Sequence, residues 1–585
     1  VSAASSSSRV RAVGLARGPA SSLAIAPLRL GDRAPRDCSP EGPCPRCGPP
    51  LSASGPRVFV QRCGWKGCRR SQPALQSSPQ RVSRSDSRSP GFSGRQLKPQ
   101  FFPKTRFAPS EKLPVPRWRH ITYDFLATED INRDRIQDVL FLYKNSNSSN
   151  NSNLSCADEG FSSPCTFVAA VSGANGSVLW ERPAAQDGAL VQCAVPQPQG
   201  GRTSSACILV GRPSSFVAVD VFTGETLWSH PSSFGGNASI LSSLLRLPDV
   251  DADGAPDLLV LTQEEKEVSG YIYSGSTGHQ IGHRGSLGVG GTSGSLLHVT
   301  RMGAHYILFP CASSLCGRSV KGLHETVTGR GSPLKRDPLW EGMLNATTHG
   351  LLWRSPGAIR YLMTVPGKVG EDLLLVSSEA CVLLDGQELA PRWIFSAARV
   401  LRRPILGYYK PDTLAVVIEN GTGIDRQILL LDLSTGAVLW NQALPGLPGD
   451  PQSASLPTAD HRSAFFFWGL HELMGTNQTV QEPGDTQHSL YMFHPTVPGV
   501  LLELANISAN IVAFQAVLFE PSRHAAYVLL TGPTRQDAPG VVSVAKHKVR
   551  DLVPSSRVVR LAEGGPDSDE AVRDRFSRLR YRSEA

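Results

Sequence analysis

The chain has 585 residues, of which 40% are hydrophobic and 19% charged, and its formal net charge is +9. Residues 1–116 hold 20 Lys and Arg against 5 Asp and Glu, a net charge of +15, which leaves a net charge of −6 on residues 117–585. The basic balance therefore belongs to the N-terminal part alone and says nothing about the partners of the rest. No run of about 18 apolar residues occurs, so the sequence predicts no membrane-spanning helix.

Residues 1–116 are rich in Ser, Arg, Pro and Gly and show no hydrophobic periodicity. Such a composition cannot bury a core, so we predict a disordered basic tail. Five cysteines leave a zinc site open as an alternative: Cys38, Cys44, Cys47, Cys63 and Cys68. The match to zinc-site spacing is loose, since no His lies near the second pair. Nonspecific nucleic-acid binding is a further alternative, but without aromatic interleaving we predict no nucleic-acid partner.

From Trp118 onward the sequence pattern changes to short apolar runs separated by Gly, Pro, Asp and Asn. Helical periodicity is nearly absent from these runs. Runs of about four to eight residues bounded by turn residues are typical of β-strands. The body of the chain is therefore predicted to be all-β.

A cluster of aspartates within residues 248–261 predicts a calcium-binding loop. Four carboxylates precede the apolar run 258–261, and they are Asp249, Asp251, Asp253 and Asp257. Calcium takes about six to eight oxygen ligands, and Gly254 supplies the sharp turn that brings carboxylates together. We expect the Ala255 carbonyl or water to complete the ligand shell. The alternative is an acidic turn without metal, because Asp and Gly favour turns by themselves.

A weaker copy of this pattern lies at residues 130–138. It keeps four potential ligands, Asp130, Asn132, Asp134 and Asp138. An arginine, Arg135, stands where the other copy has glycine. We predict a second calcium loop here, with a metal-free turn again as the alternative.

A second repeated signal consists of a turn glycine followed by Leu-Trp. It occurs at residues 176–180, 223–228 and 435–440, with a degenerate copy that ends at Trp393 and a variant without Trp at 276–281. We interpret it as a hairpin whose returning strand carries a Trp ring into the gap between neighbouring sheets. Trp180 and Trp228 are 48 residues apart. A period of that length is typical of four-stranded propeller blades.

The predicted fold is an all-β, seven- or eight-bladed β-propeller over residues 117–562, with the disordered tail 1–116 before it and a charged tail 563–585 after it. The last aspartate of the weaker loop, Asp138, lies 38 residues before the turn glycine Gly176, whereas Asp257 lies only 21 residues before Gly278. The longer spacing predicts an exposed insertion around residues 145–165. In the charged tail, the helical spacing of Val572, Phe576 and Leu579 favours a short helix or a frayed end over a partner-binding helix.

Nine of the 14 asparagines stand in Asn-x-Ser/Thr sequons. Chance would give such a context to far fewer, so we predict N-glycosylation and a lumenal or extracellular body. The nine sites are Asn147, Asn150, Asn153, Asn175, Asn237, Asn345, Asn420, Asn477 and Asn506.

Cysteine usage in the body supports the same compartment. Proximity predicts three disulfides, Cys156 with Cys165, Cys193 with Cys207, and Cys311 with Cys316, and leaves Cys381 over. Such close pairs are typical of proteins in an oxidising environment. Buried free thiols are the alternative.

The aspartate motif resembles the FG-GAP repeats of the integrin α propeller, which end in Gly-x-Pro-Asp before a hydrophobic strand, here Gly254 to Asp257. Residues from about 117 to 585 also resemble the family with sequence similarity 234, a family of FG-GAP repeat-containing proteins. The matching runs are 130–145, 158–176, 251–261 and 551–585. That resemblance implies a single-pass type II membrane glycoprotein with FG-GAP-type calcium loops in a lumenal or extracellular propeller.

The N-terminus departs from that resemblance, because residues 1–116 contain no membrane anchor. A variant isoform and an aberrant gene-model N-terminus both account for this, and the missing initiator Met favours the second. The functional prediction is a non-enzymatic cell-surface or membrane glycoprotein that binds a protein ligand, with calcium as a structural cofactor. The alternative is a quinoprotein-like redox enzyme, because Leu-Trp hairpins also resemble the repeats of quinone-dependent dehydrogenases. Those repeats indicate fold and not chemistry, and no catalytic motif accompanies them.

Overall fold

The computed structural model describes residues 126–583, apart from a set of internal gaps. The gaps are 146–153, 200–201, 213–214, 232, 235–237, 242–243, 266, 290–293, 347–349, 397–398, 423, 448, 471–486, 520–522, 533–541 and 562–566. The predicted tail 1–116 with its cysteines, and the sequons Asn147, Asn150, Asn153, Asn237 and Asn477, lie outside the described residues.

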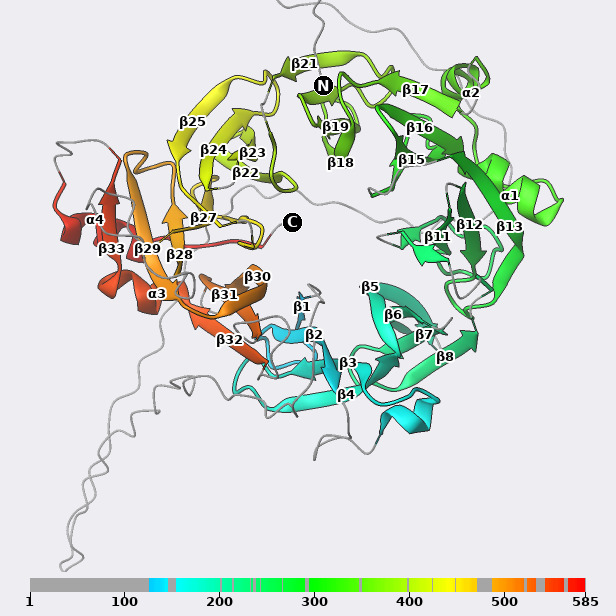
Figure 1. Cartoon of the computed structure of the whole chain (residues 1–585), viewed down its shortest axis with the longest axis horizontal. Coiled ribbons are helices and arrows are strands. Elements are labelled where there is room, and N and C mark those ends of the chain that lie inside the picture. The colour runs from blue at the N-terminus through cyan, green and yellow to red at the C-terminus, as the bar shows by residue number, and fades with distance from the viewer. Residues whose placement is uncertain are drawn as a thin grey trace, which may run out of the picture. The chain divides into compact units, whose positions relative to one another are not determined.

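The described strands form eight sheets arranged as the blades of a ring (Figure 1). Blade 1 contains β1 (Leu126–Glu129), β2 (Asp138–Asn145), β3 (Cys165–Val171) and β4 (Val178–Ala185). Blade 2 contains β5 (Asp187–Gln199), β6 (Arg202–Arg212), β7 (Ser215–Asp220) and β8 (Thr226–Pro231). Blade 3 contains β9 (Ser239–Ile240), β10 (Leu245–Arg246), β11 (Leu258–Glu264), β12 (Glu267–Tyr273) and β13 (Gln280–Val289). Blade 4 contains β14 (Leu296–Val299), β15 (His305–Cys311), β16 (Ser314–Ser319) and β17 (Leu351–Arg354).

The second half of the ring continues the pattern. Blade 5 contains β18 (Ile359–Pro366), β19 (Glu371–Ser377), β20 (Cys381–Leu384) and β21 (Pro391–Phe395). Blade 6 contains β22 (Ile405–Lys410), β23 (Thr413–Thr422), β24 (Asp425–Asp432) and β25 (Val438–Ala443). Blade 7 contains β26 (Ala454–Pro457), β27 (Ser463–Leu470), β28 (His488–Phe493), β29 (Val500–Ile507) and β33 (Arg557–Arg560). Blade 8 contains β30 (Asn510–Phe519), β31 (His524–Gly532) and β32 (Ser543–Lys548), and the total of eight lies within the predicted seven or eight.

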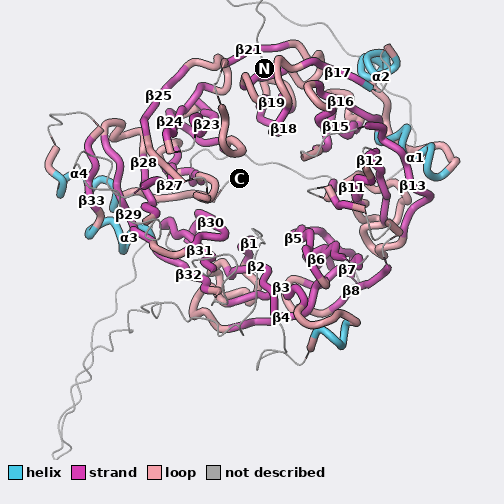
Figure 2. The backbone as a smooth tube through the Cα atoms, viewed as in Figure 1, coloured by secondary structure: helices cyan, strands magenta, loops and turns pink. Residues whose placement is uncertain are grey.

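Helices are few and lie outside the ring of strands (Figure 2). They are η1 (Cys156–Glu159), α1 (Val320–Thr328), α2 (Pro338–Asn345), α3 (Val549–Leu552), η3 (Val553–Ser555) and α4 (Asp569–Ser577). α4 buries Val572 and Phe576 in the hydrophobic cluster that blades 7 and 8 share. Of the helices that the structure describes, none has both the length and the apolar character that crossing a bilayer requires.

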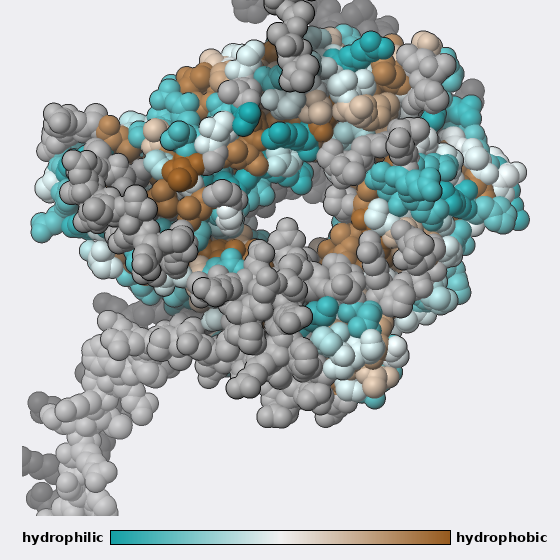
Figure 3. All heavy atoms as spheres, in the orientation of Figure 1, coloured by the Kyte–Doolittle hydropathy of each residue, from teal (hydrophilic) through white to brown (hydrophobic). Residues whose placement is uncertain are grey.

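Each blade is an antiparallel meander, so alternate connections emerge at the same end of the strands. We call one end the aspartate-loop face, formed by the connections from first to second and from third to fourth strands. The opposite face is formed by the connections from second to third strands and from each blade to the next. The innermost strands surround a central opening, which the space-filling view shows from one side (Figure 3).

The core is divided among the spaces between neighbouring blades. Leu140 and Leu142 of blade 1 pack in one cluster with Leu209 and Val219 of blade 2, and all four side chains are nearly or fully buried. The opposite side of blade 1 packs against blade 8, where Phe141 and Val528 belong to one cluster. Because second and third strands are covered on both faces, their sequences are continuous apolar runs.

Tryptophan rings link consecutive blades, as the repeated hairpin signal predicted. Trp180 of β4 donates its indole N–H to the Val221 carbonyl of blade 2 at 2.8 Å, and its ring packs against Gly224. Trp393 of β21 makes the equivalent bond to the Leu433 carbonyl of blade 6, also at 2.8 Å. The ring of Trp228 lies on Gly278 of blade 3, and Trp440 reaches the Pro498 carbonyl of blade 7 at 3.0 Å.

One tryptophan that joins consecutive blades does not come from a strand. Trp340 of α2 is fully buried and donates to the Gln387 carbonyl in blade 5 at 3.0 Å. The sequence signal missed it because no turn glycine and Leu-Trp pair precede it. In blade 4 a helix inserted before the fourth strand therefore performs the linking role.

We predict that the turn glycines cannot be replaced. Gly224 has a φ of +73°, and a Cβ there would lie 2.7 Å from the Trp180 ring. Gly224→Ala should cost about 1–3 kcal/mol for the left-handed backbone and a similar amount for overpacking. Gly160→Ala is the matched control, because Gly160 has a φ of +76° and open space around it. Chemical denaturation should show the larger loss for Gly224→Ala, and equal losses would contradict the docking role of this turn.

Candidate functional site

Three of the four aspartates in the stronger loop converge in space. Asp249, Asp251 and Asp257 each offer a carboxylate oxygen, and these oxygens lie within 4.8 Å of one another. Calcium binds oxygen at about 2.3–2.6 Å, so ligands on opposite sides of one ion are about 5 Å apart. This donor set therefore has the chemistry and the spacing that a calcium ion requires.

The fourth aspartate of this loop has other partners. Asp253 accepts hydrogen bonds through Oδ2 from the Ser274 hydroxyl at 2.7 Å and from the Ser276 hydroxyl. Burial acts to raise the pKa of Asp253, but the hydrogen bonds from the two hydroxyls and from the Ala255 amide together outweigh it, so the pKa is lowered. Its carboxylate thus ties the loop to the turn between β12 and β13.

Asp257 is the buried anchor of the loop. It accepts the amide N–H of Val250 at 2.7 Å and that of Gly275 at 3.2 Å. Burial raises its pKa to about 6, and the charges of Asp251 and Asp253 act in the same direction. A nearby cation would relieve both effects, since it favours the ionised form.

The weaker loop has the same backbone scaffold. Asp138 accepts N–H groups from Ile131 at 2.8 Å and from Gly173 at 2.8 Å, as Asp257 does from Val250 and Gly275. Arg135 adopts the left-handed conformation at the position of Gly254, with a φ of +65°. Asn132 and Asp134 hydrogen-bond to each other, and Asp130 accepts the amide N–H of Arg135 at 3.0 Å.

A lysine from the other end of the chain reaches this weaker loop. Lys546 of β32 is buried and donates its ammonium to the Gln137 carbonyl, next to Asp138. Burial lowers the pKa of Lys546 to about 8, although the charges of Asp138 and Asp134 act to raise it. The weaker loop therefore has a cation of the protein itself beside its carboxylates. No sequence signal could reveal this pair, because its members lie 409 residues apart.

A third aspartate in the equivalent position was not singled out from the sequence. Asp372 of β19 accepts the Gly386 N–H at 3.1 Å and pairs with Arg392 at 3.1 Å. Three blades thus hold the turn before their fourth strand through an aspartate at the start of the second strand. An internal cation lies near two of these aspartates, whereas the charges that most affect Asp257 are those of other carboxylates.

The three cysteine pairs predicted by proximity are confirmed. The structure joins Cys156 to Cys165, Cys193 to Cys207, and Cys311 to Cys316, and leaves Cys381 as a buried thiol. Burial raises the pKa of Cys381 to about 12, so it is unreactive.

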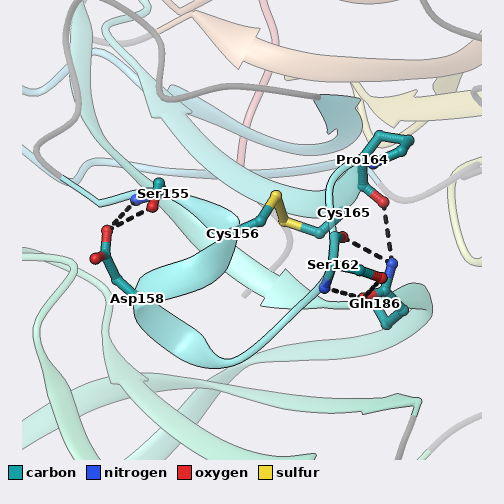
Figure 4. The surroundings of a disulfide bond; sticks show 7 residues. All are labelled: Ser155, Cys156, Asp158, Ser162, Pro164, Cys165 and Gln186. Atoms are coloured by element: carbon teal, nitrogen blue, oxygen red, sulfur yellow. Dashed lines mark hydrogen bonds between the residues drawn. A yellow bond between two sulfur atoms is a disulfide. The ribbon is translucent and has the colours of Figure 1, made fainter.

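The first disulfide lies in the segment that joins β2 to β3, where the sequence predicted an insertion (Figure 4). Beside it, the Gln186 side chain accepts the Ser162 N–H at 2.6 Å and donates to the Ser162 carbonyl at 2.9 Å. A second donation reaches the Pro164 carbonyl at 3.1 Å. The disulfide fastens the insertion to β3 of blade 1, and Gln186 fastens it to the link between blades 1 and 2.

Four of the predicted glycosylation sites fall on described residues. Asn175, Asn345 and Asn506 are exposed, and Asn420 is half-buried. Asn420 accepts the Arg399 amide N–H at 2.8 Å, and Asn506 donates to Gln487 at 2.8 Å. Asn175 belongs to the turn between β3 and β4 on the aspartate-loop face.

A cleft of about 660 Å³ opens between blades 5 and 6 on the aspartate-loop face. Lys368 and Asp412 lie on its walls as exposed charges, and Tyr408 contributes an aromatic surface. Arg392 also lines the cleft, where it bridges Asp372 and Asp385. No sequence pattern marks this cleft, because its walls come from separate turns of two blades.

Fold and site together define a disulfide-linked β-propeller with acidic loops on one face. Residues 118–582 match the profile of the FAM234A/B beta-propeller family, and the chain belongs to that family. It is 77% identical to Protein FAM234A of Homo sapiens over 465 residues, which covers 80% of this chain and 84% of that protein. It is 72% identical to Protein FAM234A of Rattus norvegicus, with 79% and 84% covered.

Solved structures with a similar fold include enzymes. A europium-containing methanol dehydrogenase aligns with a TM-score of 0.42 and 9% identity, covering 75% of this chain and 92% of that one. A likeness at this level reflects the propeller fold and supports no catalytic role.

Asp257 predicts a pH dependence of stability in the presence of a chelator. Because its folded-state pKa is about 6, above the ordinary value of 3.8, the folded protein holds this proton more tightly than the unfolded chain. The contribution of Asp257 to stability therefore falls as pH rises from about 4 through about 6. Asp257→Asn removes this titration. In chelator, the melting temperature of this variant should therefore rise relative to that of the unmodified protein as the pH increases from 4.5 to 7. A constant difference between the two proteins would contradict the raised pKa.

Proposed function

We propose that this chain is the glycosylated ectodomain of a membrane or cell-surface protein and binds a protein partner through its aspartate-loop face. The observation that carries this proposal is the cleft between blades 5 and 6, which opens on that face and brings Tyr408 together with the exposed charges of Lys368 and Asp412.

Of the four sequons on described residues, Asn420 lies near the end of β23 and Asn506 near the end of β29, both toward the opposite face. Asn175 and Asn345 lie in connections between third and fourth strands, which belong to the aspartate-loop face. N-linked glycans are bulky and hydrated, but glycans at the four described sites would leave the cleft open, because none of these asparagines lines it. The aspartate-loop face would stay accessible over most of its blades. It also carries the cleft between blades 5 and 6, where Tyr408 lies beside charges of both signs. Aromatic side chains with a polar surround are the usual composition of a protein-binding surface.

The disulfides support the compartment that this function needs. All three join cysteines within one blade or its insertion, over sequence separations of 9, 14 and 5 residues. Disulfides persist in secreted and lumenal proteins and are rare in the cytosol. Together with the sequons they favour a lumenal or extracellular propeller over a cytosolic one.

We further propose that calcium binds at Asp249, Asp251 and Asp257 and stabilises the loop before β11. The loop forms part of the same face, so the ion would fix the shape of the binding surface and not take part in chemistry. At the weaker loop Lys546 already supplies a positive charge, so calcium would contribute less there. At Asp257 three carboxylates lie close together and repel one another, so a bound cation would stabilise this cluster more than the weaker loop.

Calcium should raise the melting temperature of the purified propeller. At about 100 times the Kd the gain in stability is about 2.7 kcal/mol. Asp251→Asn should abolish the gain, because Asp251 is an exposed ligand whose neutral substitute weakens ion binding. Asp134→Asn, in the weaker loop, is the matched control and should leave most of the gain in place. Identical melting in calcium and in chelator for the unmodified protein would exclude a structural ion.

A glycan introduced on the aspartate-loop face should block the partner. Pro366→Asn with Lys368→Thr creates a sequon at the edge of the cleft, where both residues are exposed. Proximity labelling on cells that express the anchored propeller should lose the proteins that the unmodified protein labels. Asn420→Gln, which removes a sequon from the opposite face, should keep them, and a glycosidase mobility shift verifies both variants. Unchanged labelling by the glycan-bearing variant would place the binding surface elsewhere.

A further inference from the structure

A cavity lies between the outer strand of blade 3 and the two helices that blade 4 inserts before its fourth strand. Its volume is about 270 Å³, and residues of β13, α1, α2 and the end of β16 line it. The two helices lie on the outside of the ring, with α1 beside β13 and α2 beside β17 (Figure 1). The cavity is therefore at the rim of the propeller and shares no residue with the cleft between blades 5 and 6.

The lining combines an apolar wall with hydrogen-bonding groups. Leu287 and Leu323 are nearly buried, and together with Leu344 they form the apolar part. Arg318 donates through Nε to the Leu287 carbonyl at 3.1 Å, whereas its two terminal nitrogen atoms form no hydrogen bond to the described part of the chain. The Thr326 hydroxyl donates to a carbonyl of its own helix at 2.8 Å, so its lone pairs remain as acceptors. Such a lining suits a small ligand that has both apolar and polar groups.

Asn345, one of the predicted glycosylation sites, is itself part of this lining. It is the last residue of α2, and its side chain is exposed. The other three sequons on described residues line neither this cavity nor the cleft between blades 5 and 6. A glycan on Asn345 would therefore start at the cavity, because its first sugar is bonded to the side-chain nitrogen of that asparagine.

We propose that the first N-acetylglucosamine of a glycan on Asn345 occupies this cavity and joins the outer strand of blade 3 to the helices of blade 4. The inference rests on the proposed ectodomain, since it needs a compartment in which glycans are attached. The leucines would pack against the acetamido methyl group and the apolar face of the sugar ring, and Arg318 would donate to the acetamido carbonyl. Glu341 also lines the cavity and accepts the Tyr306 hydroxyl at 3.0 Å. Its carboxylate would repel an anion, so a neutral sugar fits better than a phosphate.

The size of the cavity and the covalent attachment both support a single bound sugar. Sites for drug-sized ligands have volumes of roughly 300–1,000 Å³, so this smaller cavity has room for one monosaccharide, and the rest of the glycan would extend into solvent. Attachment to Asn345 makes the contact intramolecular, which removes the entropic cost of bringing a free ligand to its site. Contacts that would be too weak to hold a free sugar are therefore sufficient here.

The melting temperature of the full chain, directed to the secretory pathway of cells that make only high-mannose glycans, tests this proposal. Endoglycosidase H leaves one N-acetylglucosamine on each occupied site, so trimming should leave the melting temperature unchanged. Asn345→Gln removes that sugar as well and should lower the melting temperature of the trimmed protein. Ser177→Ala is the matched control, because it removes the sequon at Asn175, away from the cavity, and should have no effect. Equal melting of Asn345→Gln and the unmodified protein would overturn the proposal.

Protection of the sugar linkage supplies an independent readout. Peptide N-glycosidase F cuts between asparagine and the first sugar, so under native conditions it should release the glycan from Asn345 more slowly than from Asn175. Site-resolved mass spectrometry measures both rates, and Arg318→Met should speed release at Asn345 alone. Equal rates at the two sites of the unmodified protein would contradict a buried first sugar.

Occupancy separates this inference from the proposed function. A glycan on Asn175 but none on Asn345 would overturn the inference and leave the glycosylated ectodomain in place. A chain without a glycan at any sequon would overturn both.

Discussion

The contact between a tryptophan ring and the turn of the next blade is the interaction on which the ring of blades depends. Blades in a propeller contact only their neighbours, so each interface must be specified separately. The ring of Trp180 fits against Gly224 because glycine leaves room for it and adopts the left-handed φ of the turn. The indole N–H bonds to a backbone carbonyl and so fixes the angle between sheets, which apolar packing alone leaves free.

In three blades, a buried aspartate also holds the turn before the fourth strand. Asp138, Asp257 and Asp372 accept the N–H of a turn glycine from a neighbouring strand, so a buried carboxylate must sit near the face of the propeller. A buried charge is costly unless another charge compensates it. Lys546 and Arg392 do this in two blades, whereas around Asp257 further carboxylates accumulate. The same architectural need thus places an ion pair in blade 5, a lysine near the aspartate of blade 1 and a candidate ion site in blade 3.

Sequence patterns predicted the features that depend on residues near one another in the chain. The turn glycine with Leu-Trp gave the blade period, and close spacing gave the three disulfides. Features that depend on the closed ring had no such signal, since Lys546 meets the first acidic loop only because blade 8 lies beside blade 1. The diversion of Asp253 to Ser274 and Ser276 also needed the structure, because the spacing of the four aspartates is that of a complete ligand set. The blade number stayed open at seven or eight because blade 4 carries two helices and blade 8 has three described strands.

The two faces of the propeller differ because the meander separates their connections. Several turns on the aspartate-loop face are tied down by aspartates and tryptophans, so their side chains are held in defined positions. The opposite face includes the connections between second and third strands, and the one between β2 and β3 carries the insertion with the first disulfide. A surface that selects one protein partner needs fixed side chains, because ordering them on binding costs free energy. The rigidity that the docked tryptophans provide is therefore also what suits the aspartate-loop face to recognition.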